Sequence, residues 1–414
     1  MDRVEFTREM KKTYTILAPD MLPMHFALLV KVLEKHGYRV EVLKNDGQGV
    51  VTAGLRYVHN DTCYPALLCI GQFISALQSG KYDLDRTALL LTQTGGGCRA
   101  SNYIHLLRKA LQKAGMGQIP VISINPAGLE KNSGFRFTPR LILEILYSIY
   151  YADALMLLKN QAEPYETEKG SAARLADAWI DRLAAQFQKS PILPVIRYRS
   201  NLKAIVRDFE ALERRQEKKI KVGIVGEIYV KFSSMGNNHL ERFLLEQGCE
   251  VDVPGLLGFL AYCVEVRIDD IDLYGGSRLA RWILRRVMDY VTHTEKLTER
   301  AIRRYSSYRP AGLFRQSKAN LNGLLGYGCK MGEGWLLPAE MIELIESGVS
   351  NIVCVQPFGC LPNHIVGKGP IHALRERYPE ANIVPIDYDP SSSMVNQENR
   401  LKLMLAVARE NLRP

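Results

Sequence analysis

The sequence predicts an α/β protein made of two doubly wound, Rossmann-like halves, each with a parallel sheet, and a ligand-binding cleft between them. Three observations support this fold class. Helical patterns alternate with short apolar strands along most of the 414 residues. Strands such as ALLLT at 88–92 are continuous apolar runs, which is typical of parallel strands covered on both faces. Pro191, Pro194 and a charged segment interrupt the alternation, which then begins again.

The first half, residues 1–209, opens with a strand, a helix ended by Gly37 and a second strand. Further along, Thr138 followed by Pro139 is typical of a helix N-cap with proline at the first helical position. The expected strands of this half lie at 14–18, 38–43, 88–92 and 119–124. The expected helices lie at 21–35, 64–77, 99–114, 139–159 and 171–188.

The second half, residues 210–414, begins around a charged segment at 207–221 (RDFEALERRQEKKIK), which we expect to be a helical connector. A buried strand at 222–225 follows and ends in Gly226. Two further strands are expected at 351–355 and 382–386. Helices are expected at 239–246, 277–305, 338–346 and 392–409.

Composition and charge exclude several classes of protein. With 47% hydrophobic and 24% charged residues, the chain is neither disordered nor collagen-like. The longest continuous apolar run, 255–264, is about half the length that crosses a bilayer, and the amino end lacks an apolar signal core, so we expect a cytoplasmic protein without membrane contact. The net charge of +10 could serve an anionic cofactor or an acidic redox partner. Segment 207–221 interleaves acidic residues and contains one aromatic residue, Phe209, which argues against nucleic-acid binding.

The eight cysteines carry the strongest functional signal. Cytoplasmic thiols stay reduced and the sequence has no CxxC pair, so disulfides and compact zinc sites lose support. Four cysteines with glycine, proline or small polar neighbours stand where a strand or loop passes into a helix: Cys63, Cys98, Cys329 and Cys360. Thiolates at such positions are stabilised by free backbone N–H groups, which favours metal ligation or redox chemistry. The glycines expected to let backbone approach a bound cofactor are Gly97, Gly328 and Gly359.

A short internal duplication relates two of these cysteines. The strand ALLLTQ leads to Cys98, and the strand NIVCVQ leads to Cys360. If both cysteines follow the carboxyl ends of parallel strands, they face one cleft. Several thiolates without a histidine at ligand spacing indicate a soft-metal site, and an iron–sulfur cluster is favoured over zinc.

Four neighbouring residues complete the candidate site. Arg99 and Lys330 each follow a proposed ligand directly and would offset the negative charge of a thiolate-bound cluster. His59 and His364 are candidate proton-carrying catalytic residues, with loop hydrogen bonding or packing as the alternative interpretation.

At these motifs the sequence resembles the 2-hydroxyacyl-CoA dehydratase superfamily. It is most similar to the double-cubane cluster proteins and to the carboxy-terminal region of large acyl-CoA dehydratase activases. The strings that carry the resemblance extend over nearly the whole chain: NDTCYPA, QTGGGCRASNY, GYGCKMGEG, QPFGCLPNHI, PIDYDPSSS and NQENRLKLM.

The resemblance implies a double-cubane [8Fe-9S] cluster in which each cubane is held by three cysteine thiolates. The ligand role carries over to Cys63, Cys98, Cys329 and Cys360, and then to Cys69 and Cys354 because both halves contain C-x₅-C. Cys263 is the reserve candidate. The resemblance also implies a homodimer that receives electrons from an ATP-hydrolysing reductase of actin-like fold, itself carrying a [4Fe-4S] cluster.

The expected function is therefore that of an iron–sulfur reductase that reduces a small substrate in the interdomain cleft. The chain has no Walker A sequence, so we expect ATP hydrolysis on a separate partner. One alternative is a 2-hydroxyacyl-CoA dehydratase subunit with a single [4Fe-4S] cluster. A second is a non-catalytic electron-transfer or regulatory partner of the ATPase, and a third is a cluster-free small-molecule-binding module.

Overall fold

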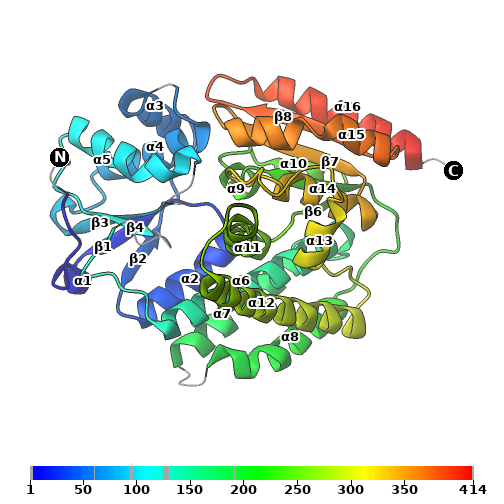
Figure 1. Ribbon diagram of the computed structural model, residues 1–414, viewed down its shortest axis with the longest axis horizontal. Helices are drawn as coiled ribbons and strands as arrows, with labels where there is room; N and C mark the ends of the chain where they lie inside the picture. Colours follow the sequence, from blue (N-terminus) through cyan, green and yellow to red (C-terminus); the bar gives the residue numbers. More distant parts are fainter. Residues whose placement is uncertain (1–2, 60, 94–96, 125–129, 190–192, 413–414) are drawn as a thin grey trace.

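The structure is a computed structural model that describes residues 3–59, 61–93, 97–124, 130–189 and 193–412. It confirms the predicted fold class, with two four-stranded, all-parallel sheets flanked by helices. Figure 1 shows the first sheet on the left and the second on the right. The first sheet has the order β2-β1-β3-β4, built from β1 (Thr15–Ala18), β2 (Arg39–Val42), β3 (Thr87–Thr92) and β4 (Val121–Ile124).

Helices cover both faces of the first sheet. Two of them, α3 and α4, pack closely because a Cβ atom on Gly71 would lie only 2.2 Å from the carbonyl oxygen of Val50. The short 3-10 helix η2 (Arg99–Asn102) leads into α5. The helices of this half are α1 (Met10–Thr13), α2 (Pro23–Lys35), α3 (Gln48–Tyr57), α4 (Tyr64–Gln78) and α5 (Tyr103–Lys113).

Four long helices join the halves: α6 (Pro139–Ala162), α7 (Ser171–Lys189), α8 (Pro194–Glu210) and α12 (Arg278–Tyr305). Helix α6 begins as predicted, because the Thr138 hydroxyl caps it by accepting a hydrogen bond from the Leu141 N–H at 3.2 Å. It contacts α2 in the first half and β6 (Glu250–Asp252) in the second. Among the described residues, one helical segment, Pro139–Tyr165, is long and apolar enough to cross a membrane, and the protein buries 67% of its apolar window.

The second sheet repeats the topology of the first. Its order is β6-β5-β7-β8, with β5 (Lys221–Gly226), β7 (Asn351–Pro357) and β8 (Asn382–Tyr388), so the third strand of each half lies beside the first. This shared order extends the duplication suggested by the two strand sequences. The helices around this sheet are α9 (Ile228–Phe232), α10 (Leu240–Glu246), α11 (Leu256–Tyr274), α13 (Phe314–Asn320), α14 (Leu336–Glu346), α15 (Ile371–Arg377) and α16 (Met394–Leu412).

The charged connector was predicted wrongly as one helix over 207–221. Helix α8 starts at Pro194 and ends at Glu210, and the residues that follow are extended. Their backbone is held by the 166–167 segment instead, because Thr167 N–H donates to the Glu213 carbonyl at 3.2 Å and Arg215 N–H donates to the Tyr165 carbonyl at 2.7 Å. Tertiary hydrogen bonds therefore replace helical ones here.

Buried apolar side chains form two clusters, and the larger one extends from Ile16 in the first sheet to Val222 in the second. The two halves thus share a hydrophobic core, which fixes the strand ends of one sheet relative to those of the other.

Candidate functional site

The candidate ligands follow the strands at equivalent places in the two sheets. Cys98 comes after β3 and Cys360 after β7, the third strand of each half. Cys63 lies in the connection from β2 to β3, and Cys329 lies in the equivalent connection from β6 to β7. In a sheet of this order the first and third strands are neighbours, and the chain adds strands on one side of the first strand and then on the opposite side. Ligands bind at this topological switch point, at the carboxyl ends of the first and third strands.

The loops that carry Cys63 and Cys360 touch each other. The backbone N–H of Tyr64 donates a hydrogen bond to the Phe358 carbonyl at 3.0 Å. Gly359 has φ +73°, and a Cβ atom there would lie 3.1 Å from the Cα of Cys63. Only a glycine combines this left-handed backbone with so close an approach without strain. A loop of the second half therefore closes directly on the first turn of α4.

The loops that carry Cys98 and Cys329 also meet. A Cβ atom on Gly97 would lie 2.3 Å from the Sδ atom of Met331, two residues after Cys329. A Cβ atom on Gly332 would lie 3.3 Å from the side chain of Pro362, which joins the Cys329 loop to the Cys360 loop. All four cysteine loops therefore belong to one region, which we call the cysteine site: Cys63, Cys98, Cys329 and Cys360.

The four thiols of the cysteine site differ in exposure: Cys63 and Cys360 are buried, Cys98 is partly buried and Cys329 is exposed. Cys63 is 4% exposed, and its Sγ lies 2.9 Å from the Tyr103 hydroxyl. Burial raises the pKa of Cys63 and raises the pKa of Cys98 to about 11. Burial also raises the pKa of Cys360, and the nearby carboxyls of Glu333 and Glu227 raise it further. The protein alone thus disfavours thiolates here, and metal binding would have to release their protons.

Two buried carboxyls lie among these thiols, and neither was a candidate from the sequence. Glu227 caps α9 by accepting from the Val230 N–H at 2.9 Å, and Glu333 accepts from the Ile228 N–H at 3.0 Å. Burial, followed by the charge of Glu333, raises the pKa of Glu227 to about 8. Burial also raises the pKa of Glu333, so the site favours the neutral form of both carboxyls more than water does. The sequence signal was an acidic residue directly after the buried strand GIVG, which predicted only a packing turn.

The remaining candidate ligands lie in different surroundings. Cys69 is fully buried in α4, and burial raises its pKa. Cys354 is buried in β7, where its described contacts are with Gln356 and Gly367 and with no other cysteine. By contrast, Cys263 on α11 is exposed. Cys263 and Cys329 share the neighbour Tyr262: burial has the largest effect in raising the pKa of this tyrosine, and both thiols raise it further.

The candidate charges and glycines around the cysteines are engaged in different ways. The Arg99 guanidinium donates to the Asp61 carbonyl and lowers the pKa of Cys63 against the larger effect of burial. The Lys330 ammonium is instead paired with Asp270. A Cβ atom on Gly328 would lie 3.1 Å from the Tyr274 hydroxyl, so this glycine accommodates the end of α11 and not the thiols.

The two candidate histidines differ in their partners. His59 Nδ1 accepts a hydrogen bond from the Asp61 N–H at 3.2 Å, and its side chain is 70% exposed. His364 lies between the Cys360 carbonyl, 2.9 Å from Nδ1, and the Asp387 carboxylate, 3.2 Å from Nε2. Because both partners are acceptors, only the protonated ring makes both hydrogen bonds.

In the part of the chain that the structure describes, no three His, Cys, Asp or Glu side chains are grouped closely enough to hold a single metal ion. An iron–sulfur cluster makes a different demand, because each thiolate binds a different iron atom of a larger body. The donor set fits such a group: soft sulfur ligands come from both halves, Cys63 and Cys360 are buried, and burial favours the neutral form of the nearby carboxyls. Comparison with protein-family models and with curated proteins finds no match to this chain.

Proposed function

We propose that this protein is an iron–sulfur reductase that takes low-potential electrons from a separate ATP-hydrolysing reductase and passes them to a small substrate. The observation that carries the proposal is the closure of the Cys360 loop on Cys63, with Gly359 between them. Sulfur ligands 297 residues apart in sequence (63 and 360) are thereby supplied to one buried region at the carboxyl ends of both sheets.

In this proposal the four cysteines of the cysteine site hold the cluster, which supplies one-electron chemistry when it is bound. The surroundings of the other thiols support Cys263 as a fifth ligand in preference to Cys354, because Cys263 is exposed beside Cys329 and Cys354 is enclosed in β7. Cys69, one and a half turns into α4 from Cys63, is the sixth candidate.

The protein's own acid groups support a reduction that consumes protons. Burial raises the pKa of Glu227 to about 8 and also raises the pKa of Glu333, and the Tyr103 hydroxyl is within hydrogen-bonding distance of Cys63. Protonated groups in a water-poor site can deliver protons to a substrate as electrons arrive. His364, hydrogen bonded to the Cys360 carbonyl, would orient that loop and not act on the substrate.

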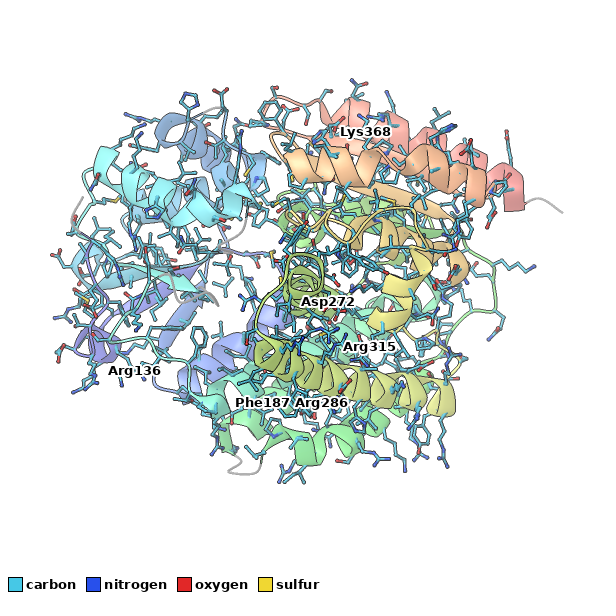
Figure 2. The ribbon with its side chains drawn as sticks, in the orientation of Figure 1. Arg136, Phe187, Asp272, Arg286, Arg315 and Lys368 are labelled. Carbon is cyan, nitrogen blue, oxygen red and sulfur yellow. The ribbon has the colours of Figure 1, made fainter. Side chains whose placement is uncertain are left out.

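A second copy of the chain is the proposed partner of an exposed apolar stripe on α12. Leu279, Trp282 and Ile283 are 67%, 59% and 48% exposed and follow the i, i+3, i+4 spacing of one helix face. Charged residues of α11 and α12 such as Asp272 and Arg286, labelled in Figure 2, are paired internally, Asp272 with Arg281 and Arg286 with Asp289, which leaves the stripe free for a partner of the same apolar character.

A dehydratase subunit with one [4Fe-4S] cluster is the second candidate function. It is favoured by the grouping of the buried thiols, because Cys98 interacts electrostatically with both Cys63 and Cys360, which makes three ligands of the kind that one cubane needs. Iron content separates the two candidates, because the resemblance implies about eight irons per chain for the reductase and about four for the dehydratase.

The test is the iron and acid-labile sulfide content of protein purified without oxygen, compared among three cysteine variants. Cys98→Ser and Cys360→Ser should each lose most of the iron while the circular dichroism spectrum stays unchanged. Cys249→Ser is the matched control, since this buried cysteine lies at the start of β6, away from the cysteine site. A folded wild-type protein without iron, or unchanged iron in both site variants, would refute the proposal.

A further inference from the structure

A polar pocket at the other end of the strands of the second sheet, away from the cysteine site, has no part in the proposed function. It lies beside the amino ends of β5 and β6, whereas the cysteine site follows the carboxyl ends of the strands. Its volume is about 240 Å³. We call it the Arg309 pocket, and the charged side chains that line it are Arg214, Arg215, Lys221, Arg309, Glu217 and Glu250.

The lining of the Arg309 pocket carries more positive than negative charge. Four of its side chains are basic and two are acidic. Glu217 is already paired with Lys219 outside the lining, at 2.9 Å. Arg214 is paired with Glu210, and Arg309 is paired with Glu250 and Asp252. Lys221 and Arg215 are therefore the lining cations without an ion-pair partner among the described residues, and an anion would supply the missing charge.

Arg309 is held rigidly at the pocket wall. Its backbone is clamped by Gln161, which donates from Nε2 to the Arg309 carbonyl at 2.8 Å and accepts from the Arg309 N–H at 2.9 Å. Its Nη2 atom donates to Glu250 at 2.5 Å and to Asp252 at 3.2 Å, while its Nε–H is buried without a hydrogen-bond partner among the described residues. These contacts hold the guanidinium in place at the wall of the pocket.

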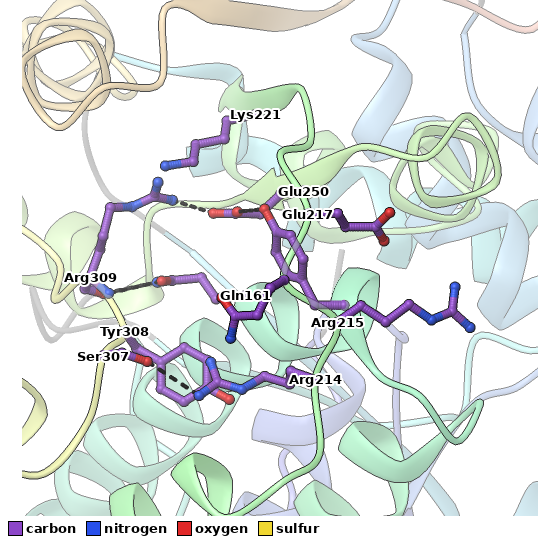
Figure 3. A pocket seen from close by; sticks show the side chains of 11 residues that line it. Gln161, Arg214, Arg215, Glu217, Lys221, Glu250, Ser307, Tyr308 and Arg309 are labelled. Atoms are coloured by element: carbon purple, nitrogen blue, oxygen red, sulfur yellow. Dashed lines mark hydrogen bonds and ion pairs between the residues drawn. The ribbon is translucent and has the colours of Figure 1, made fainter.

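Lys221 adds a second cation beside this guanidinium. Figure 3 shows its ammonium group on the same side of the pocket as the Arg309 guanidinium, with no interaction drawn to it. Among the described residues, Lys221 acts electrostatically on buried Asp252. Burial raises the pKa of Asp252, and the positive charges of Arg309 and Lys221 lower it. Glu250 and Asp252 neutralise Arg309, so the ammonium group of Lys221 is the charge at this wall that a bound anion would meet.

The opposite wall is also pre-arranged. The Arg214 guanidinium is fixed by Glu210 at 2.9 Å and lies 4.3 Å from the centre of the Tyr308 ring. The Tyr165 hydroxyl donates to Glu250 at 2.6 Å, which fixes this lining side chain. Little side-chain ordering remains to oppose binding.

We infer that the Arg309 pocket is a binding site for a phosphate-bearing anion. Lys221 and Arg309 contact the phosphate oxygens, and Arg214 contributes from the facing wall. The shared chemistry is the phosphate group, whether it comes from a free inorganic anion or from a nucleotide whose base would stack on a tyrosine ring.

The test is isothermal titration calorimetry of the full chain with inorganic pyrophosphate in one arm and AMP in the other, at constant ionic strength. Wild-type protein should bind at least one probe, and Lys221→Met should weaken that binding about tenfold or more. Lys218→Met is the matched control, because it removes the same charge from an exposed neighbour outside the pocket and should change binding less than about twofold. Tighter binding of either probe supports the site and identifies the source of the phosphate.

A second variant keeps the inference testable if Lys221→Met does not fold. Lys221→Arg retains the charge at this strand position and should bind within about threefold of wild type. Failure of both probes to bind wild-type protein, or equal weakening by Lys221→Met and Lys218→Met, would overturn the inference. Neither result touches the iron content, so the proposed reductase function is tested separately.

Discussion

Replacing Gly359 with alanine tests the contact on which the cysteine site depends. Gly359 has φ +73°, a left-handed conformation that costs a residue with a Cβ atom about 1–2 kcal/mol. The added methyl group would also lie 3.1 Å from the Cα and 3.4 Å from the backbone nitrogen of Cys63. Because backbone atoms cannot rotate away as a side chain does, this overpacking adds about 1–3 kcal/mol.

Gly348→Ala is the matched control for this prediction. Gly348 has φ +85°, and nothing lies within 4 Å of the position that its Cβ would take. This variant therefore carries the conformational cost without the contact, about 1–2 kcal/mol. The difference between the two variants isolates the energy of the loop closing on Cys63, which should be about 1–3 kcal/mol.

The measurement is the free energy of unfolding from urea denaturation of iron-free protein, followed by the iron content of reconstituted protein. Gly359→Ala should lose more stability than Gly348→Ala and should also bind less iron, because the Cys360 loop is pushed away from Cys63. Equal losses of stability in the two variants would show that the loop does not approach α4 so closely. Unchanged iron in Gly359→Ala would separate this contact from cluster binding.

Three further predictions concern buried charge and assembly. Lys231→Met should lower the free energy of unfolding, measured by urea denaturation, by about 3–5 kcal/mol, because it leaves Glu340, 3.0 Å away, as an unpaired buried carboxylate. A double variant that also carries Glu340→Met should recover most of this loss. Burial raises the pKa of Glu295 from 4.5 to about 7, so the folded state binds a proton that the unfolded state releases, and the free energy of unfolding falls as the pH rises from 4.5 to 7. Glu295→Gln should make that fall less steep in denaturation curves measured across this pH range. An unchanged slope in the variant would contradict the prediction. Trp282→Asp should convert a dimer into a monomer in sedimentation analysis, whereas Leu403→Asp, at an equally exposed position on α16, should leave the mass unchanged.

Most of the helices and strands followed from the sequence because they depend on local patterns, although strand β6 and helices α3 and α11 were not predicted. Continuous apolar runs such as 88–92 and 351–355 can be buried only when both faces of a sheet are covered, and parallel strands provide that. Once the strands are parallel, Cys98 and Cys360 must follow carboxyl ends, so their equivalent placement was also predictable. The connector at 207–221 was not, because hydrogen bonds to the distant 166–167 segment decide its conformation.

The surroundings of each cysteine were decided only by tertiary structure. Cys354 and Cys360 were both candidates on spacing, yet strand β7 encloses the first and the following loop carries the second to Cys63. The burial of Glu227 and Glu333 among the thiols likewise depends on how two loops pack, which no local pattern contains. Local sequence thus determined which elements form and where they end, while the charge, solvent access and neighbours of each side chain arose from contacts between residues hundreds of positions apart.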